Sequence, residues 1–245
     1  MKKIGKKKKD EGYPWAFVAT PAYDGKVDVD YSQALAEAAF CAPLHGVKLT
    51  AAVMGNGAFI DLARNIFVKM FLEDNPDCTH LFFIDSDLKF PPNAFIGLMK
   101  ANLPVCAGVY RRRQDPEDYP LSLAEWPEGG GLWLDGDWVM ANRVPTGFLC
   151  IRRDIVEEMA AEANQLGIHG QEGRVPQLFY TKLDDDNRFI GEDFAFCDDY
   201  VKKYGKPIHV WPNIDFRHGG YDGNLYEWFD KKITEAESKK TTSAA

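Results

Sequence analysis

Short apolar runs alternate with segments of helical periodicity over about the first 110 residues of the chain. Each run is bounded by polar or turn-forming residues, which predicts strands that are buried on both faces. The strands are expected at residues 15–20, 47–54, 81–84 and 103–110. The helices between them are expected at residues 31–44, 59–72 and 93–100, with Asp30 and Asn93 as caps. This alternation indicates βαβ units and an α/β fold with a parallel sheet.

The pattern changes after Arg111, Arg112 and Arg113. Residues 121–140 are rich in Trp, Gly and Asp, and predict a hairpin or loop that could cover a cleft. Further strands are expected at residues 146–151 and 207–211, and further helices at 154–165 and 191–204, the latter with Gly205 as C-cap. Residues 171–187 read as polar and irregular. From Asp230 onward the chain is polar, and we expect it to fray.

The length of 245 residues predicts one large domain, or a domain with an appended lobe. Net charge is −8, but the first ten residues carry six Lys and one Asp (+5), so the rest of the chain carries −13. An acidic body argues against a broad nucleic-acid-binding face, although the lysines add weak attraction to polyanions. Residues 1–12 are expected to form a disordered tail.

No apolar stretch approaches the roughly 20 residues that span a bilayer, and no apolar segment of a secretory signal follows the lysines. The cysteines are dispersed, without Cys-x-x-Cys spacing, and several lie in apolar contexts. They are Cys41, Cys78, Cys106, Cys150 and Cys197. We interpret them as reduced core residues of a cytoplasmic protein, and not as a zinc site or a disulfide framework.

The chemistry-bearing segment follows the apolar run 81–84, where polarity switches abruptly at Asp85, Ser86 and Asp87. In open α/β sheets the ligand crevice lies outside the carboxyl ends of the strands. Two Asp at i and i+2 of an extended chain point to the same side and can share one hard cation, Mg²⁺ or Mn²⁺, which would neutralise a phosphate. The alternative is a strand-to-loop corner, in which one Asp caps the next helix and the other is solvated.

Other polar groups also recur at the ends of apolar elements. They are Arg64-Asn65, Tyr110-Arg111, Glu192-Asp193 and His218. Each has an ordinary structural explanation as well: a solvated helix arginine, acidic residues that favour a helix N-terminus, and a histidine in a glycine turn. The individual residues therefore leave function open.

The order of these groups resembles that of GT-A glycosyltransferases, the nucleotide-sugar transferases with a DxD motif, and is closest in style to family 2-like members from bacteria, phages and large viruses. The matching segments are Asp85-Ser-Asp87, Gly108-Val-Tyr110, Gly147-Phe-Leu-Cys-Ile151, Gly191-Glu-Asp193 and His218-Gly-Gly220, within residues 15–220. The resemblance implies a Rossmann-like, mostly parallel sheet flanked by helices, with a smaller acceptor-side region of strands and loops.

The resemblance also implies a domain plan. Residues 13–229 would form a single domain, with a nucleotide-sugar-binding half at 13–113 and an acceptor and catalytic half at 114–229. Residues 230–245 would be a polar C-terminal tail. The Gln-x-x-Arg-Trp motif of processive polysaccharide synthases does not follow the Glu-Asp helix.

Individual roles follow from the same resemblance. Asp87 is the expected principal ligand of Mn²⁺ or Mg²⁺, His218 completes the metal shell, and Asp85 lies nearer the ribose or the metal. The nucleotide sugar, with UDP or GDP as its nucleotide, is expected to contact Pro21, Ala22, Tyr23, Arg64, Asp85, Ser86 and Tyr110. Asp193, paired with Glu192 in the catalytic segment, matches the base that removes the acceptor proton in inverting members. The N-terminal dipole of its helix is expected to keep Asp193 ionised.

Other functions remain open. A haloacid-dehalogenase-like phosphatase also uses a strand that ends in Asp-x-Asp, but its motif usually continues with Thr or Val, whereas Leu88 follows here. A dinucleotide oxidoreductase needs a third glycine beyond Gly55 and Gly57. A nucleotide-sugar-binding module without turnover is a third alternative. Possible acceptors are a glycan, a protein side chain, a small molecule or a modified base in nucleic acid, and the lysine tail slightly favours a polyanion.

Overall fold

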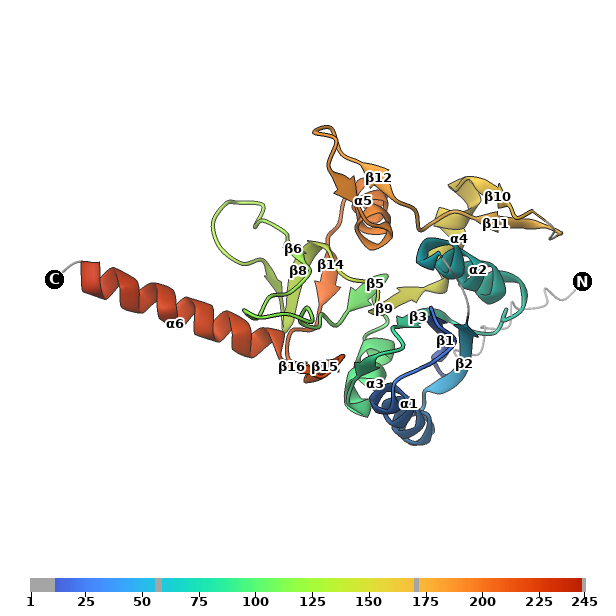
Figure 1. The fold of residues 1–245 in the computed structure, drawn as a ribbon, viewed down its shortest axis with the longest axis horizontal. Coiled ribbons are helices and arrows are strands. Elements are labelled where there is room, and N and C mark those ends of the chain that lie inside the picture. Colours follow the sequence, from blue (N-terminus) through green and yellow to red (C-terminus); the bar gives the residue numbers. More distant parts are fainter. Residues whose placement is uncertain (1–11, 56–58, 170–171, 244–245) are drawn as a thin grey trace, which may run out of the picture.

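A computed structural model describes residues 12–55, 59–169 and 172–243 of the chain. Within these residues, strands form a nine-stranded sheet with helices on both sides (Figure 1). The expected Lys-rich tail and the second glycine after the second strand lie outside the described residues.

The first half of the chain builds the predicted βαβ units. Its strands are β1 (Trp15–Ala22), β2 (Lys48–Gly55) and β3 (His80–Ile84). Its helices are α1 (Val29–Cys41), α2 (Ile60–Glu73) and α3 (Pro92–Ala101), and a 3-10 turn, η1 (Ala42–His45), follows α1. β1 lies between β2 and β3 and is parallel to both. The caps differ from expectation, because Asp28 precedes α1 and Pro91 precedes α3.

Strand alternation divides the core between the two faces of the sheet. Leu81 and Phe83 of β3 pack with α2, α4 (Arg153–Glu162) and α5 (Glu192–Tyr204). Phe82 and Ile84 pack on the opposite face with α1 and α3. Figure 1 shows these two helical layers above and below the strands. Every residue of β3 is buried, as the continuous apolar run predicts, and each buried Phe or Leu contributes about 2 kcal/mol of transfer free energy.

The sheet is mixed, which corrects the expectation of a mostly parallel one. β9 (Phe148–Arg152) lies between β3 and β5 (Val105–Ala107) and is antiparallel to both. The remaining strands of the sheet are β14 (Ile208–Val210), β8 (Trp138–Arg143), β6 (Ser122–Leu123) and β7 (Leu134–Asp135). A strand buried on both faces is a continuous apolar run whichever way it points, so the pattern could not give its direction.

Three small sheets lie outside the nine-stranded sheet, and most of their strands come from the second half of the chain. They are β10 (Gln165–Gly167) with β11 (Arg174–Pro176), β12 (Lys182–Leu183) with β13 (Phe189–Ile190), and β16 (Tyr221–Gly223) with β15 (Phe216–His218) and β4 (Leu88–Lys89). Helix α4 therefore ends before the predicted 165, and part of the segment 171–187 is paired. The predicted hairpin near residue 135 is present, since β7 and β8 pair antiparallel.

The C-terminal segment is helical, where we expected it to fray. Helix α6 (Leu225–Ser243) extends away from the body (Figure 1). Its first turn is capped by Asn224, whose side-chain oxygen accepts the N–H groups of Tyr226 at 3.0 Å and Glu227 at 3.3 Å. Trp228 and Phe229 then pack against the core. The cap and the two aromatic residues explain why the helix forms despite its polar sequence.

Among the described residues, no helix has the length and apolar character that crossing a membrane requires. The five cysteines are unpaired; Cys78, Cys106, Cys150 and Cys197 are buried, whereas Cys41, also expected in the core, is only half-buried.

Candidate functional site

The Asp85–Asp87 segment lies where the carboxyl ends of β1 and β3 meet, because the two strands are parallel. The chain then forms β4, which pairs with β15 so that Leu88 lies opposite His218. This long-range pairing carries His218 to the side of Asp87, although 131 positions separate the two residues in the sequence. The Gly219 N–H also donates to the Asp87 carbonyl at 3.2 Å.

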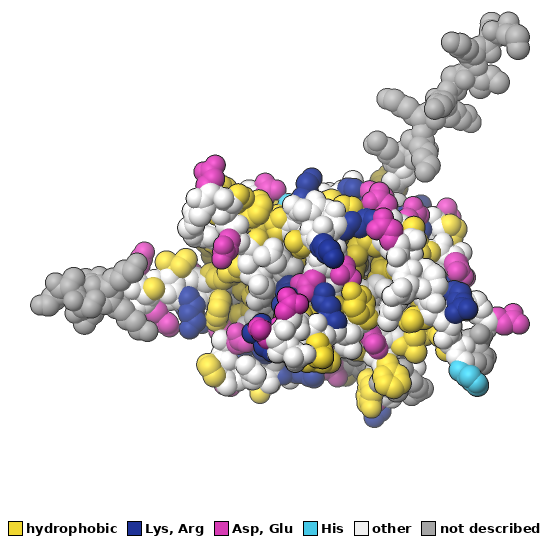
Figure 2. Space-filling model, turned by 90° about the horizontal axis from the view of Figure 1, so that it is seen from above, with side chains coloured by type: hydrophobic (Ala, Val, Ile, Leu, Met, Phe, Trp, Pro, Cys, Tyr) yellow, Lys and Arg dark blue, Asp and Glu magenta, His cyan; other side chains and the backbone are white. Residues whose placement is uncertain are grey.

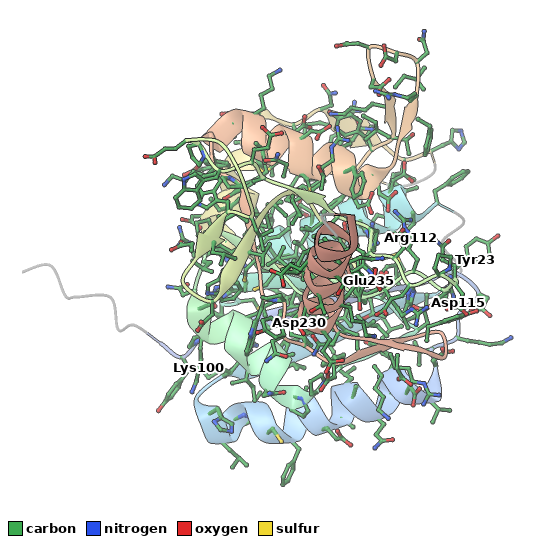
Figure 3. All side chains as sticks on the ribbon, turned by 90° about the vertical axis from the view of Figure 1, so that its left-hand side faces the viewer. Tyr23, Lys100, Arg112, Asp115, Asp230 and Glu235 are labelled. Carbon is green, nitrogen blue, oxygen red and sulfur yellow. The ribbon has the colours of Figure 1, made fainter. Side chains whose placement is uncertain are left out.

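A cleft of about 360 Å³ opens at this point. It is lined by Pro21, Ala22, Tyr23, Asp85, Ser86, Asp87 and His218, together with Arg113 and the apolar residues Met54, Ile60 and Ala63. The first seven are all residues that the sequence nominated for the donor and metal sites. Figure 3 shows Tyr23, Arg112 and Asp115 on one side of the molecule, where the arginine segment approaches the loop after β1.

Asp87 and His218 form an ion-pair contact inside the cleft. Nε2 of His218 lies 3.5 Å from Oδ2 of Asp87, and the opposite ring nitrogen, Nδ1, donates to the Arg111 carbonyl at 2.9 Å. Burial alone would lower the pKa of His218, but its interactions with Asp87 and the Arg111 carbonyl raise it. The interaction with His218 holds the pKa of Asp87 below its usual range, with Arg113 adding to it and burial opposing it. Asp87 is therefore ionised at neutral pH.

Asp85 faces a different set of partners. Its Oδ2 accepts a hydrogen bond from the Tyr110 hydroxyl at 2.8 Å, and its Oδ1 lies 3.3 Å from an Arg64 nitrogen. Burial, followed by the charge of Asp85, raises the pKa of Tyr110 well above its ordinary value, so the hydroxyl stays protonated and donates. Both carboxylate oxygens of Asp85 are thus engaged within the protein.

Gly147 makes this arrangement possible. A Cβ at that position would lie 2.1 Å from the Tyr110 hydroxyl and 2.2 Å from Oδ2 of Asp85. Its carbonyl also accepts the backbone N–H of Asp85 at 3.0 Å. The glycine of the Gly-Phe-Leu-Cys-Ile segment therefore lets β9 approach the Asp85 carboxylate closely.

Arg64 lies behind the cleft and does not line it. The side chain is 4% exposed and lies between Asp85 and Glu192, with which it forms a second, closer ion pair. Burial would lower the pKa of this guanidinium, but the charges of Asp85 and Glu192 raise it. Arg64 and Tyr110, which were expected to contact a nucleotide sugar, are both buried, and both bind Asp85.

Asp193 is the second residue of α5 and follows Glu192 directly. Its Oδ1 accepts the Phe194 N–H at 2.7 Å. Burial raises the pKa of its carboxyl, and Glu192 raises it further, while Arg64 opposes the shift. The direction is opposite to the one expected from the helix dipole, because the desolvation penalty exceeds the stabilisation from the helix terminus. A raised pKa makes the carboxylate a stronger proton acceptor once it is ionised.

Fewer side chains are placed to ligate a cation than the sequence suggested. Within the described residues, no group of three or more His, Cys, Asp and Glu side chains is placed to hold a metal ion. Asp87 and His218 fit the protein share of a Mn²⁺ or Mg²⁺ shell, since one carboxylate and one imidazole are suitable ligands that leave positions for other oxygens. Asp85 does not fit as a ligand in its present orientation, because Tyr110 and Arg64 bind its oxygens.

Arg113 is the charged residue of the cleft lining that the sequence did not indicate. Its Nη1 donates to Oδ2 of Asp87 at 2.8 Å. The available signal was the run of three arginines that follows Gly-Val-Tyr, but three neighbouring arginines give no indication of which one enters a site.

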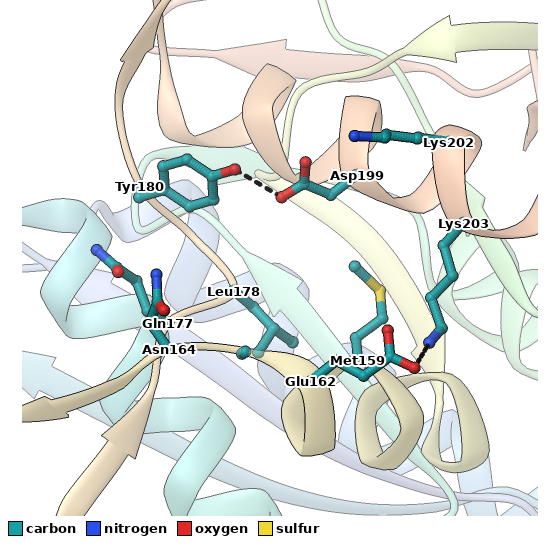
Figure 4. A pocket seen from close by; sticks show the side chains of 10 residues that line it. Met159, Glu162, Asn164, Gln177, Leu178, Tyr180, Asp199, Lys202 and Lys203 are labelled. Atoms are coloured by element: carbon teal, nitrogen blue, oxygen red, sulfur yellow. Dashed lines mark hydrogen bonds and ion pairs between the residues drawn. The ribbon is translucent and has the colours of Figure 1, made fainter.

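A second cavity, of about 530 Å³, lies between α4, α5 and the segment around residue 178 (Figure 4). Its polar side chains are largely paired with one another: the Tyr180 hydroxyl donates to Asp199 at 2.8 Å, and Lys203 forms an ion pair with Glu162. None of the sequence-nominated site residues lines it. Figure 2 shows acidic and basic side chains interspersed over the coloured part of the face seen from above.

No family model matches the chain, and no curated protein matches it. Two solved structures are similar in part. A glycosyltransferase involved in the glycosylation of the major capsid of PBCV-1 is 12% identical with a TM-score of 0.31, over 59% of this chain and 63% of that one. The inositol-1-phosphate CTP transferase from T. maritima is 11% identical with a TM-score of 0.42, over 84% and 89%.

The chain thus spans about 63% of the length of the first of these transferases. TM-scores below 0.5 at such identities carry no argument about function.

Proposed function

We propose that this protein is a glycosyltransferase that moves a sugar from a UDP- or GDP-sugar to an acceptor hydroxyl, with Mn²⁺ or Mg²⁺ held at Asp87 and His218. The observation that carries the proposal is the convergence of these two side chains in a cleft bordered by residues 21–23. An ionised carboxylate and an imidazole at the carboxyl ends of parallel strands are suited to a cation that accompanies a diphosphate.

The remaining cleft residues supply contacts of the kind a nucleotide requires. Pro21, Ala22 and Tyr23 would border the base, and Tyr23 is 77% exposed at the rim, where its ring is free to stack. Met54 and Ile60 give the cleft an apolar side. A few polar groups in a partly apolar cleft are typical of small-molecule sites.

In the proposed reaction, Asp87 and His218 would hold the divalent cation, and Tyr110 and Arg64 fix the Asp85 side chain in the turn. A bound divalent cation supplies Lewis-acid stabilisation of the charge that develops on the leaving diphosphate. The acceptor oxygen attacks the sugar carbon and the bond to the phosphate oxygen breaks, with its electron pair leaving on the diphosphate. Asp193 accepts the proton of the acceptor hydroxyl.

The link between Arg64 and Glu192 supports a shared site for donor and acceptor. Arg64 joins Asp85, in the turn after β3, to Glu192 in the first turn of α5, and Asp193 is the next residue after Glu192. Asp193 does not itself line the cleft, and its proposed role rests on its position beside Glu192 at the start of α5. The acceptor remains one of the hydroxyl classes named from the sequence.

A phosphatase of the haloacid-dehalogenase type would use the first Asp of the motif as its nucleophile. Asp85 is that residue. Both carboxylates line the cleft, but Tyr110 and Arg64 bind both oxygens of Asp85, whereas among the described residues the side-chain contacts of Asp87 are made through Oδ2. The geometry therefore favours Asp87 as the functional carboxylate, which is the arrangement proposed for a glycosyltransferase.

A panel of UDP- and GDP-sugars, incubated with Mn²⁺, tests the proposal through release of the nucleoside diphosphate. We expect slow hydrolysis of at least one donor, abolished by chelator and by Asp87→Asn. Binding of a donor without release, under conditions in which candidate acceptors are supplied, would instead identify a non-catalytic binding module. Release of inorganic phosphate from simple phosphate esters would favour the phosphatase.

A further inference from the structure

The side chains of the three consecutive arginines contact three different parts of the protein. Arg111 donates to the carbonyl of Gln114 and to Asp115, and its guanidinium lies 5.2 Å from the centre of the Tyr221 ring. Arg112 donates to Asp118 at 2.9 Å. Only the third of them, Arg113, lines the cleft. The first two therefore fix the loop, and Arg113 is the member that can meet a ligand.

The aliphatic part of the Arg113 side chain lies against Gly219, although more than half of the side chain is exposed to solvent. A Cβ on Gly219 would lie 2.4 Å from Cδ of Arg113, so this side chain passes directly over the glycine. Gly219 has φ = +53°, a backbone conformation that side chains rarely adopt. The first glycine of His-Gly-Gly thus provides a path for the arginine, whose side chain is 57% exposed.

Arg113 and a divalent cation bound at Asp87 would compete for the same carboxylate. Nη1 of Arg113 donates to Oδ2 at 2.8 Å, and Nε2 of His218 approaches that oxygen at 3.5 Å. A cation held by these two ligands would lie beside a positive guanidinium and repel it. The guanidinium would then require another anionic partner close to the present position of the side chain.

We propose that Arg113 is a phosphate-binding residue, which yields Asp87 to the divalent cation and donates to a phosphate oxygen of the nucleoside diphosphate. The inference rests on the proposed function and adds the residue that recognises the diphosphate. Of the residues lining this cleft in the described chain, Arg113 alone is a Lys or Arg. A planar guanidinium matches phosphate oxygens in pairs, and Arg64, expected in this role from the sequence, is occupied by Asp85 and Glu192.

Isothermal titration calorimetry on the full chain tests the inference with Mn²⁺ alone and then with UDP and GDP at saturating Mn²⁺. Arg113→Gln is compared with Arg112→Gln, a matched change one position away that contacts only the loop. For Arg113→Gln we expect Mn²⁺ alone to bind about two- to fivefold more tightly, because a partly exposed ion pair no longer competes. We expect the nucleotide to bind roughly tenfold more weakly, because a charge-assisted hydrogen bond is lost. Arg112→Gln should behave as wild type in both titrations.

Opposite changes in the two affinities are the signature of this role. Equal Mn²⁺ affinity in wild type and Arg113→Gln, or equal nucleotide affinity, would overturn the inference while leaving the proposed function in place. Failure of both Mn²⁺ and nucleotide to bind any of the proteins would contradict the proposed function itself. Thermal unfolding of each variant identifies a loss of binding that comes from misfolding, and Arg113→Lys then provides a second, milder test, with an intermediate nucleotide affinity expected.

Discussion

The Tyr110 hydroxyl donates a 2.8 Å hydrogen bond to Oδ2 of Asp85, and this contact divides the two carboxylates of the DxD motif between different tasks. Both carboxylates line the cleft, but Tyr110 and Arg64 bind both oxygens of Asp85, while Asp87 contacts Arg113 and His218 through Oδ2. The motif therefore combines one positioning carboxylate with one that is available to ligands.

Removal of the Tyr110 hydroxyl tests this division. We expect Tyr110→Phe to lower the free energy of unfolding by about 1–3 kcal/mol, because a half-buried carboxylate loses a hydrogen bond from a buried hydroxyl. Urea denaturation measures the change. Tyr204→Phe is the matched control, since that hydroxyl donates to Glu158 on the exposed surface, and a change below about 0.5 kcal/mol is expected there. Equal losses in the free energy of unfolding for the two variants would show that the hydrogen bond to Asp85 stabilises the protein no more than the exposed one.

Gly147→Ala tests the packing around the same carboxylate by adding a methyl group next to it. The added methyl group would lie 2.1 Å from the Tyr110 hydroxyl and 2.2 Å from Oδ2 of Asp85, so both side chains must move. We expect a loss of about 1–3 kcal/mol in the free energy of unfolding, which is typical of overpacking, together with weaker binding of UDP or GDP. Gly12→Ala, with nothing within 4 Å of its new Cβ, is the control. An unchanged Gly147→Ala protein would contradict the packing described around Asp85.

The local parts of the fold could be predicted from the sequence. The buried strand β3, the βαβ units and helix α5 follow from apolar periodicity and from the turn residues at their ends. Helix α6 carried a recognisable start in Asn224 and Glu227, three positions apart, which the polar composition beyond residue 230 obscured.

The non-local parts could not be predicted in this way. Periodicity does not encode strand direction, so the antiparallel insertion of β9 between β3 and β5 was missed. The ion pair of Arg64 with Glu192 joins positions 128 apart, and no local pattern marks such partners. His218 was assigned to the cleft by resemblance alone, and the pairing of β15 with β4 now provides the physical reason. The sequence also did not indicate that burial would raise the pKa of Asp193.

Asp193 and Glu192 are neighbours with different expected roles. We predict that Asp193→Asn lowers sugar transfer roughly 10²-fold, the usual scale for loss of a positioned base, with nucleotide and Mn²⁺ affinity preserved. Because the ionised carboxylate is the active form, wild-type transfer should fall as the pH drops through the raised pKa of Asp193. Steady-state kinetics over a pH series measures both effects.

Glu192→Gln is compared with Asp193→Asn, because it changes the neighbouring carboxylate. It removes the partner of a buried arginine, so the main expected effect is a loss of about 2 kcal/mol in the free energy of unfolding. Near wild-type transfer by Asp193→Asn would exclude Asp193 as the base and would favour a retaining mechanism or a purely structural role at the start of α5.

His80 makes stability depend on pH. Burial lowers the pKa of this histidine from 6.5 to about 4 in the folded protein. The folded state therefore resists protonation, and its stability is fully present above about pH 6.5 and lost as the pH falls from there toward about 4. We expect the free energy of unfolding to drop by about 2 kcal/mol between about pH 7.5 and about pH 5 from this residue.

Urea denaturation at the two pH values, on wild type and His80→Gln, isolates that contribution. The variant should show a shallower decline, because it has no group to titrate at this position. His45→Gln changes an exposed histidine and should keep the wild-type pH dependence. A decline of the same size in His80→Gln would assign the pH effect to the carboxylates instead.

The central claim is that Asp87 and His218 bind a divalent cation together with a nucleoside diphosphate. Calorimetric titration of UDP and GDP, with Mn²⁺ and with chelator, tests it most directly on wild type and Asp87→Asn. The account predicts binding with Mn²⁺ that chelator weakens strongly, and a loss of roughly tenfold or more in nucleotide affinity for Asp87→Asn. Equal nucleotide affinity with and without Mn²⁺, unchanged by the substitution, would contradict it.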